Sequence, residues 1–491
     1  MTPPSNALLA GDAPSHGGAD ISYAPGPTPA VAAVAPASKE KPPAKAKERY
    51  VYLDAMKGLM ILWGIPVHAC VVSHSKFFKL VSDISNCVRM EAFFMISGFL
   101  TYMLVKRYGA GTIMRKRTVA VGLPLLSVVA LLNPFTNWLI LKYKGGAAVP
   151  GLKDFFTGQI PPELYHADIT WGWHLHIWFL VVLLTLASMS GPIMTAIDRA
   201  LAWSRPRLAR LPDEVLLFLV ALVAIGCVVA ARIGYEAAVK PYTHESFHYL
   251  LRMVGYYFGF FALGMAMYAS PRVLGIFTRC HWIQLFVSCG LLWAARLWKS
   301  GFAEGSHSIA KKMAELVNLA AEAYLAVIAV AVLFTFFRRF CSGTGRTMWL
   351  SPMHWVQLVA SGVMLFAVTG LQGTLPAALA PGLLLGAQGY FFVMVCLVIF
   401  GLFEHFSKDP GKVMHFIVES AFCVYLFHYL VIYLCASWLR NFIGDDFTLS
   451  FLVTLGTTAV TMLIYEYAVR RNGVLRCLFL GKLPKREKAK A

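Results

Sequence analysis

Apolar stretches of about 20 residues, separated by short polar segments, make up most of this chain between residues 51 and 468. An α-helix of that length crosses the hydrocarbon core of a bilayer, so the pattern predicts an all-α fold, a polytopic transmembrane helical bundle of ten to twelve spans. The upper number counts two less apolar stretches, the seventh and the ninth. The predicted spans are residues 51–73, 87–106, 118–141, 174–197, 213–231, 248–268, 280–295, 315–337, 350–371, 382–403, 413–438 and 447–468.

The ends of the chain differ from this pattern. Residues 1–48 are rich in Ala, Pro, Gly and Ser and then turn basic, which is typical of a disordered tail. Residues 49–470 are predicted to form one transmembrane domain, and residues 471–491 a basic tail near membrane lipid. No signal-peptide pattern opens the chain, so we expect the first span to direct insertion.

Composition supports a membrane protein and sets its orientation. The chain is 58% hydrophobic and 14% charged, with a mean hydropathy of +0.62. Its net charge of +19 lies in the connecting segments, so we expect no nucleic-acid partner. The tails and even-numbered connections carry more than twice as many Lys and Arg residues as the odd-numbered ones, which predicts that both termini are cytoplasmic. The ten cysteines include no Cys-x-x-Cys pair, so neither a metal site nor a disulfide framework is indicated.

Three ionisable residues, Asp54, Lys57 and His68, share one face of the first predicted span. The eleven steps from Lys57 to His68 make about three helical turns, or roughly 16 Å along the axis. A charged group in hydrocarbon costs on the order of 2.5–3.5 kcal/mol, so this face is expected to line a polar interior. We take it as the site hypothesis.

These residues suit two kinds of chemistry. The imidazole of His68 can take a proton from a hydroxyl group, although a hydrogen bond to another helix explains a lone intramembrane His equally well. Asp54 and Lys57 either neutralise each other or face an anionic cofactor at the cytoplasmic end. The cluster Arg115, Lys116 and Arg117 precedes the third span, and it either binds phosphate as well or anchors the chain by the positive-inside rule.

The second span begins with Arg89 and Glu91, which form an ion pair or bind an acidic or polyhydroxylic substrate. Ser97 lies before a glycine and has no adjacent base, so a packing role is favoured over a nucleophile.

His174 and His176 stand two positions apart and would point about 200° apart on a regular helix, so both cannot face one site. His428 and Glu466 lie in later apolar spans, where each is either an interhelical hydrogen-bond partner or a site residue. The aromatic and acidic segment 142–173 either covers a carbohydrate or forms an interfacial belt.

Together, five segments resemble the membrane-bound acyltransferase family 3, and within it the osmoregulated periplasmic glucan succinyltransferases. They are YLDAMKGLMILWGIPVH, VRMEAFFMISGF, HIWFL with Trp178, VYLFHYLVI and YEYAVRRNGVLRCLF, in that order between residues 52 and 479.

The resemblance implies ten core spans in a bacterial inner membrane and acyl transfer from cytoplasmic acyl-CoA to a sugar hydroxyl outside. It assigns His68 as the essential histidine and Lys57, where Arg is common, as its basic partner. Arg115, Lys116 and Arg117 stand only loosely for the paired arginines of the family, and Glu91 replaces an often apolar residue.

We therefore expect an inner-membrane O-acyltransferase that moves succinyl from acyl-CoA to periplasmic glucan hydroxyls, with no permanently bound cofactor. Glucan-synthesis proteins are further candidate partners. An O-acetyltransferase of another envelope polysaccharide, a transporter or flippase, and a scaffold subunit for glucan export are the alternatives. A transporter predicts internal repeats, and none is visible in the sequence.

Overall fold

The computed structural model describes residues 51–145, 151–157, 174–279, 281–302, 309–341, 352–371, 376, 379–406 and 410–482. The chain divides into Met1–Arg49 and Tyr50–Ala491, and every described residue belongs to the second unit. The expectations for the tail 1–48, for most of the segment 142–173 and for residues 483–491 lie outside the described residues.

The described residues form helices and no strand, which confirms the all-α class. The helices before the 142–173 segment, and the short one within it, are α1 Val51–Leu62, α2 Gly64–Ala69, α3 Lys76–Asn86, α4 Arg89–Tyr108, α5 Ala110–Arg117, α6 Leu123–Ser127, α7 Asn133–Gly145 and α8 Leu152–Phe156. The middle helices are α10 Trp178–Ser188, α11 Ser190–Leu208, α12 Asp213–Gly234, α13 Glu245–Ala269, α14 Pro271–Ile276, α15 Trp282–Ser300 and α16 Ile309–Cys341. The last are α17 Pro352–Gly370, α18 Ala380–Phe406, α19 Pro410–Leu439, α20 Asp446–Leu463 and α21 Gly473–Leu480.

Eight helical segments of the described chain are long and apolar enough to cross a membrane, so this is a multi-pass membrane protein. A ninth span results if the pair Leu175–Ser188 and Ser190–Ser204, bent by 59°, counts as one. This number is lower than the ten to twelve predicted. The eight are Tyr52–Val72, Lys76–Tyr108, Ala110–Gly145, Asp213–Tyr242, Phe247–Ala269, Ile309–Arg338, His415–Leu439 and Asp446–Val469.

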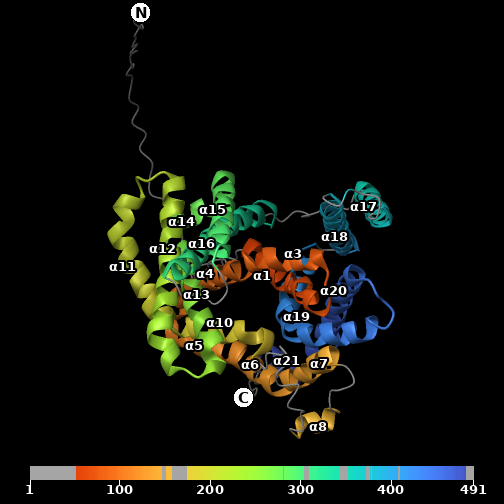
Figure 1. The fold of residues 1–491 in the computed structure, drawn as a ribbon. Helices are drawn as coiled ribbons and strands as arrows, with labels where there is room; N and C mark the ends of the chain where they lie inside the picture. The colour runs from red at the N-terminus through yellow and green to blue at the C-terminus, as the bar shows by residue number, and fades with distance from the viewer. Residues whose placement is uncertain are drawn as a thin grey trace, which may run out of the picture. The chain divides into compact units, whose positions relative to one another are not determined.

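The other three predicted spans, 280–295, 350–371 and 382–403, fold as α15, α17 and α18 but do not meet the same criterion within the described residues. The described apolar part of α17, Trp355–Gly370, is shorter than a full span. Helices α17 and α18 pack side by side, as do α15 and α16 (Figure 1).

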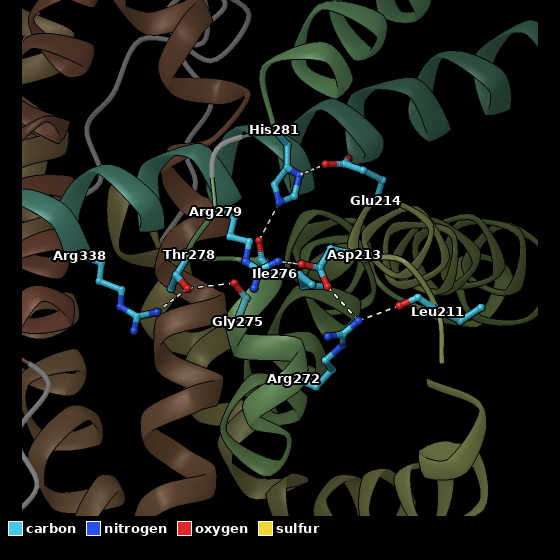
Figure 2. A network of polar contacts seen from close by, with 10 residues as sticks. All are labelled: Leu211, Asp213, Glu214, Arg272, Gly275, Ile276, Thr278, Arg279, His281 and Arg338. Carbon is cyan, nitrogen blue, oxygen red and sulfur yellow. Dashed lines mark hydrogen bonds and ion pairs between the residues drawn. The ribbon is translucent and has the colours of Figure 1, made fainter. Parts of the chain in front are cut away.

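Polar contacts show how α15 and α16 run (Figure 2). His281, just before α15, contacts Oε1 of Glu214 at 2.9 Å and the carbonyl oxygen of Ile276 at 2.7 Å. Arg338, near the end of α16, donates to Thr278 in the same connection. The start of α15 and the end of α16 therefore lie at one end of the bundle, and the two helices are antiparallel.

Arg272 and Arg279 extend this network to the start of α12 (Figure 2). Both pair with Asp213, Arg272 through Oδ1 at 2.9 Å, and Arg272 also donates to the carbonyl oxygen of Leu211 at 2.7 Å. The starts of α12 and α15 and the end of α16 therefore lie at one end, which agrees with their predicted placement on one side of the membrane.

The first span is broken near its centre, between α1 and α2 at Trp63. Pro66 cannot donate the backbone hydrogen bond that would continue the helix, and the bond from the Val67 amide to the Trp63 carbonyl is long, at 3.4 Å. The break also leaves Gly64 facing Arg89, whose Nη1 would lie 3.0 Å from a Cβ at that position. The span expected for residues 51–73 is thus one helical segment, Tyr52–Val72, with an interruption of the helical hydrogen bonding at Trp63.

Candidate active site

Four rings gather around His68 in the half of the bundle that contains the end of the first span. The His68 ring lies 5.2 Å from those of His428 and Tyr429, measured between centroids. His176 completes the group, with its centroid 4.9 Å from His428, 5.0 Å from Tyr429 and 5.4 Å from Tyr425. The structure therefore brings together three histidines that stand far apart in the sequence.

Hydrogen bonds to the chain orient two of these imidazoles. His428 Nδ1 lies 2.7 Å, and His176 Nε2 3.1 Å, from the carbonyl oxygen of Tyr425, so each nitrogen donates a proton to it. The Tyr425 hydroxyl donates in turn to the His176 carbonyl at 2.5 Å. The other nitrogens, His176 Nδ1 and His428 Nε2, are buried without a partner among the described residues. They remain available to accept a proton or a hydrogen bond.

The backbone before α10 is not a regular helix, which explains how His176 reaches the cluster. Leu175 has φ of 40°, a left-handed conformation that is uncommon for a residue with a Cβ. His174 does not join the cluster and instead stacks on Tyr249, with centroids 5.5 Å apart. The sequence predicted that His174 and His176 do not both face one site, and they do not. That prediction assumed a regular helix, whereas the structure has an irregular turn here.

A cavity of about 470 Å³ opens beside His68. Its lining combines polar, aromatic and aliphatic side chains and includes three arginines and one carboxylate. The lining residues are Val67, His68, Asn86, Arg89, Met90, Glu91, His176, Trp178, Phe179, Val228, Ala231, Arg232, Tyr249, Arg252, Met253, Tyr256, Tyr257, Leu319 and Tyr425. We refer to this space as the His68 cavity.

Arg89 and Glu91 both face the His68 cavity. Arg89 donates from Nε to the Ser85 hydroxyl at 2.8 Å. Glu91 is only 1% exposed, and its Oε1 accepts from the Tyr256 hydroxyl at 3.2 Å. Its Oε2 has no hydrogen-bond partner among the described residues, so one carboxylate oxygen is free to accept from a ligand hydroxyl.

Aromatic side chains form one wall of the same cavity. Trp178 stacks on Tyr257, with centroids 5.7 Å apart and planes inclined by 23°, and meets Tyr249 edge-on. Flat ring faces beside hydrogen-bonding groups are suited to the apolar faces and hydroxyls of a sugar. Trp178, which the sequence places in the HIWFL segment, thus belongs to the aromatic wall of this cavity.

A second cavity, of about 260 Å³, lies beside Asp54 and Lys57, near the start of the first span. The Lys57 ammonium lies 5.4 Å from the centre of the Phe93 ring. Arg117 donates to the Thr101 hydroxyl at 2.5 Å, and its charge acts on Lys57. We call this space the Lys57 cavity, lined by Asp54, Lys57, Gly58, Ile61, Phe93, Ala120, Val121, Phe179, Leu180, Leu183, Val418, Ala421 and Phe422.

Phe179 is the only described residue that lines both cavities. Its ring lies 4.4 Å from Tyr425 on the His68 side and 5.0 Å from Phe93 on the Lys57 side, between centroids. The two cavities are therefore separated by an aromatic wall with Phe179 at its centre.

Seven of the predicted site residues line neither cavity, namely Arg115, Lys116, Arg117, Ser97, His174, His428 and Glu466. Arg115 and Lys116 are exposed, and Lys116 lies over the Tyr108 ring at 4.9 Å, so only Arg117 of the basic cluster points inward. Ser97 is buried, with no hydroxyl partner among the described residues. Glu466 pairs with Arg470 at 2.7 Å and with Arg471 at 4.0 Å, at the end of the last span.

Several cavity residues were not predicted from the sequence as parts of the site. Tyr425 stands one helical turn before His428, a spacing that places both on one face and could have revealed it. Arg232 and Arg252 flank one connection. Basic residues are common at the ends of membrane spans, so nothing in the local sequence indicates that these two lie in the same cavity as His68. Among the described residues no group of three or more His, Cys, Asp or Glu side chains could hold a metal ion.

Comparison with known proteins gives a consistent result. A family model described as an acyltransferase domain matches residues 50–374. The chain is 27% identical over 243 residues to the glucans biosynthesis protein C of Salmonella schwarzengrund (strain CVM19633), which covers 47% of this chain and 61% of the relative. It is 28% identical over 251 residues to the protein of the same name from Escherichia coli O157:H7, covering 48% and 62%. These matches thus span about three-fifths of the length of the relatives. No solved structure matches the chain.

Proposed function

This chain belongs to the acyltransferase domain family, and on that premise we propose that it transfers an acyl group, with succinyl preferred, from cytoplasmic acyl-CoA to hydroxyls of periplasmic glucans. Both termini then lie in the cytoplasm, and the membrane is the bacterial inner membrane. The observation that carries this proposal is the pair of cavities at opposite ends of the first span, one beside His68 and one beside Lys57.

The Lys57 cavity suits the donor. Lys57 and the inward-pointing Arg117 are cations near the start of their spans, at the end of the bundle next to the basic tail. They would attract the phosphates of CoA, while the apolar remainder of the cavity, such as Leu180 and Leu183, accommodates the pantetheine arm.

The His68 cavity suits the acceptor. A glucan ring packs against the aromatic wall that Trp178 and Tyr257 form, and a hydroxyl donates to the free Oε2 of Glu91. These contacts position a second hydroxyl of the sugar beside the His68 imidazole.

The reaction requires one proton to move twice. His68 takes the proton of the sugar hydroxyl as its oxygen attacks the thioester carbonyl carbon. The tetrahedral intermediate then collapses, the carbon–sulfur bond breaks, and the thiolate of CoA takes the proton from His68. The products are an ester on the sugar and free CoA, and no other reactant is needed.

The charge and mass of periplasmic glucans test this proposal directly. Glucans are compared from cells with the intact gene, with a deletion, and with His68→Ala. A matched control is His415→Ala, because His415 is half-exposed on α19 and lies outside both cavities.

We expect the succinyl mass to be lost in the deletion and in His68→Ala, and to be retained in His415→Ala. Unchanged glucans in the deletion would reject this acceptor and direct the search to acetylation of another envelope polysaccharide. Full succinylation with His68→Ala would reject the role of His68.

A further inference from the structure

The lining of the His68 cavity is unusually rich in arginine. Arg89, Arg232 and Arg252 all face it, and Glu91 is the only carboxylate among its described lining residues. With His68 and His176 added, the ionisable lining is mostly basic, as expected where an anion binds.

The position of these arginines in the bundle strengthens the point. Arg89 begins α4, while Arg232 and Arg252 flank the connection between α12 and α13, so all three lie at the same end as His68. That end is the one predicted to face away from the cytoplasm, where basic residues are fewest. Orientation in the membrane therefore does not explain their presence.

The three arginines differ in the ion pairs and hydrogen bonds that their guanidinium groups already make. Arg232 pairs with Glu236, with Nη2 3.1 Å from Oε1. Arg89 is fixed by Ser85 and packs against Gly64, and among the described residues it has no ion-pair partner. Arg252 is exposed and lies 5.9 Å from the Tyr249 ring, again with no ion pair within the described part of the chain. Arg252 is therefore the guanidinium most available to a ligand.

Helix α13 directs Arg252 into the cavity. The lining residues of this helix are Tyr249, Arg252, Met253, Tyr256 and Tyr257, which recur at the three- and four-residue spacing of one helical face. Arg252 thus stands on the same face as the rings that we assign to the sugar.

The route of the donor explains which anion would arrive there. A thioester that passes from the Lys57 cavity to the His68 cavity enters the second cavity with its acyl end first. A carboxylate at the far end of the acyl chain is then the first group to meet the arginines, and the planar guanidinium binds a carboxylate through two parallel hydrogen bonds.

We propose that Arg252, supported by the charges of Arg89 and Arg232, binds the free carboxylate of a dicarboxylic acyl group and so selects a charged acyl donor over an uncharged donor of equal length. This inference rests on the proposed function, since it assumes transfer from a thioester. It assigns the choice of acyl group to three arginines of the acceptor-side cavity rather than to the cavity that holds CoA.

The test compares two donors that differ only in the terminal group, succinyl-CoA and butyryl-CoA. The acceptor is periplasmic glucan from a strain deleted for this gene, separated into neutral and anionic fractions. Full-length enzyme in lipid nanodiscs is assayed as wild type, Arg252→Gln, Arg252→Lys and Arg440→Gln. Arg440 is the matched control, because it is a surface arginine that pairs with Asp446 outside the cavity.

With neutral glucan, we expect Arg252→Gln to lower kcat/KM for succinyl-CoA by about tenfold or more, while kcat/KM for butyryl-CoA stays within about twofold of wild type. Arg252→Lys restores part of the loss, and Arg440→Gln changes neither donor. Retained butyryl transfer also shows that the variant is folded.

Three outcomes would overturn the inference. Equal loss with both donors would make Arg252 a structural residue, and equal wild-type rates with both donors would show that the carboxylate is not recognised. A loss confined to the anionic glucan fraction would place the bound anion on the acceptor. A wild-type enzyme that transfers neither acyl group to any glucan would instead reject the proposed function, which keeps the two failures distinct.

Discussion

Glu91 and Glu466 are both single carboxylates within apolar helical segments, yet their surroundings differ. Glu91 is 1% exposed, faces the His68 cavity and has one oxygen without a partner among the described residues. Glu466 is 28% exposed and pairs with Arg470 and Arg471 where the last span ends. The first arrangement leaves a buried acceptor for a ligand, whereas the second is an ordinary ion pair near the surface.

We predict effects of different size from the same amide substitution at these two positions. Glu91→Gln removes a charged acceptor from the cavity, and since a hydrogen bond to a charged group contributes about 1.5–3 kcal/mol, glucan transfer should fall about tenfold or more. Glu466→Gln removes an exposed pair of about 0–1 kcal/mol and should leave transfer within about twofold. Initial rates at matched amounts of folded enzyme decide this. Equal rates for the two variants would contradict the role of Glu91.

The sequence alone could not separate these carboxylates, because each appears as one acidic residue in an apolar stretch. The same holds for His428, whose ring contact with His68 joins α19 to the first span. For His68, residue type and place in the span predict a general base, and that role stays a prediction. Its ring neighbours depend on contacts between distant segments, which no local pattern encodes.

At the scale of elements, two glycines set the closest helix contact in the site region. Gly98 of α4 faces the Phe261 carbonyl of α13, and Gly264 of α13 faces the Met95 carbonyl of α4, and a Cβ at either position would overlap that oxygen. The sequence predicted such an approach from Ser97 and Gly98, since small residues let membrane helices pack closely. Because α4 carries Arg89 and Glu91 while α13 carries Arg252, this contact fixes two walls of the His68 cavity.

We predict that Gly264→Ala destabilises the protein strongly. The obstructing atoms are backbone, which cannot move aside like a flexible side chain, so the cost should reach the upper end of the ~1–3 kcal/mol typical of overpacking. Gly226→Ala is the control, because no atom lies within 4 Å of a Cβ at that position of α12. The midpoint of thermal unfolding in detergent should fall for Gly264→Ala and stay level or rise slightly for Gly226→Ala. An unchanged midpoint for Gly264→Ala would contradict the tight contact.

Hydropathy alone predicts where the helices are, but it does not decide which of them span the membrane. All twelve predicted stretches fall on helices, but α15, with Arg296 and Lys299 near its end, does not pass as a span by composition. Its antiparallel course beside α16 follows from the contacts of His281 and Arg338 (Figure 2) and from the ion pair between Arg296 and Glu322. The length and composition of α15 therefore do not identify it as a membrane span, whereas its tertiary contacts show that it runs alongside the spanning helix α16.

At the scale of the whole transmembrane unit, the two cavities lie toward opposite ends of the first span. Asp54 and Lys57 line one cavity and His68 lines the other, although all three were predicted on one face of one helix. Simple helix geometry predicts their separation along the axis from the sequence. It could not give the wall between them, since that wall combines Phe179 of α10 with Phe93 of α4 and Tyr425 of α19.

We predict that the size of the side chain at position 179 controls how tightly donor cleavage is coupled to transfer. In Phe179→Leu the cavities should connect more freely, so that water from the His68 side reaches the thioester. Release of CoA without acceptor should then rise relative to glucan acylation. Phe179→Trp should fill the same space and slow both reactions.

The control is Phe334→Leu, which shortens a fully buried ring of α16 that lines neither cavity. This substitution is expected to destabilise the packing to a similar extent. A change seen only with the Phe179 variants is therefore due to the aromatic wall and not to a general loss of packing. Thiol release is measured with and without glucan for all four proteins. A ratio of hydrolysis to transfer that is the same in every variant would mean that Phe179 does not separate donor from acceptor, and the acyl group would then have to reach His68 by another path.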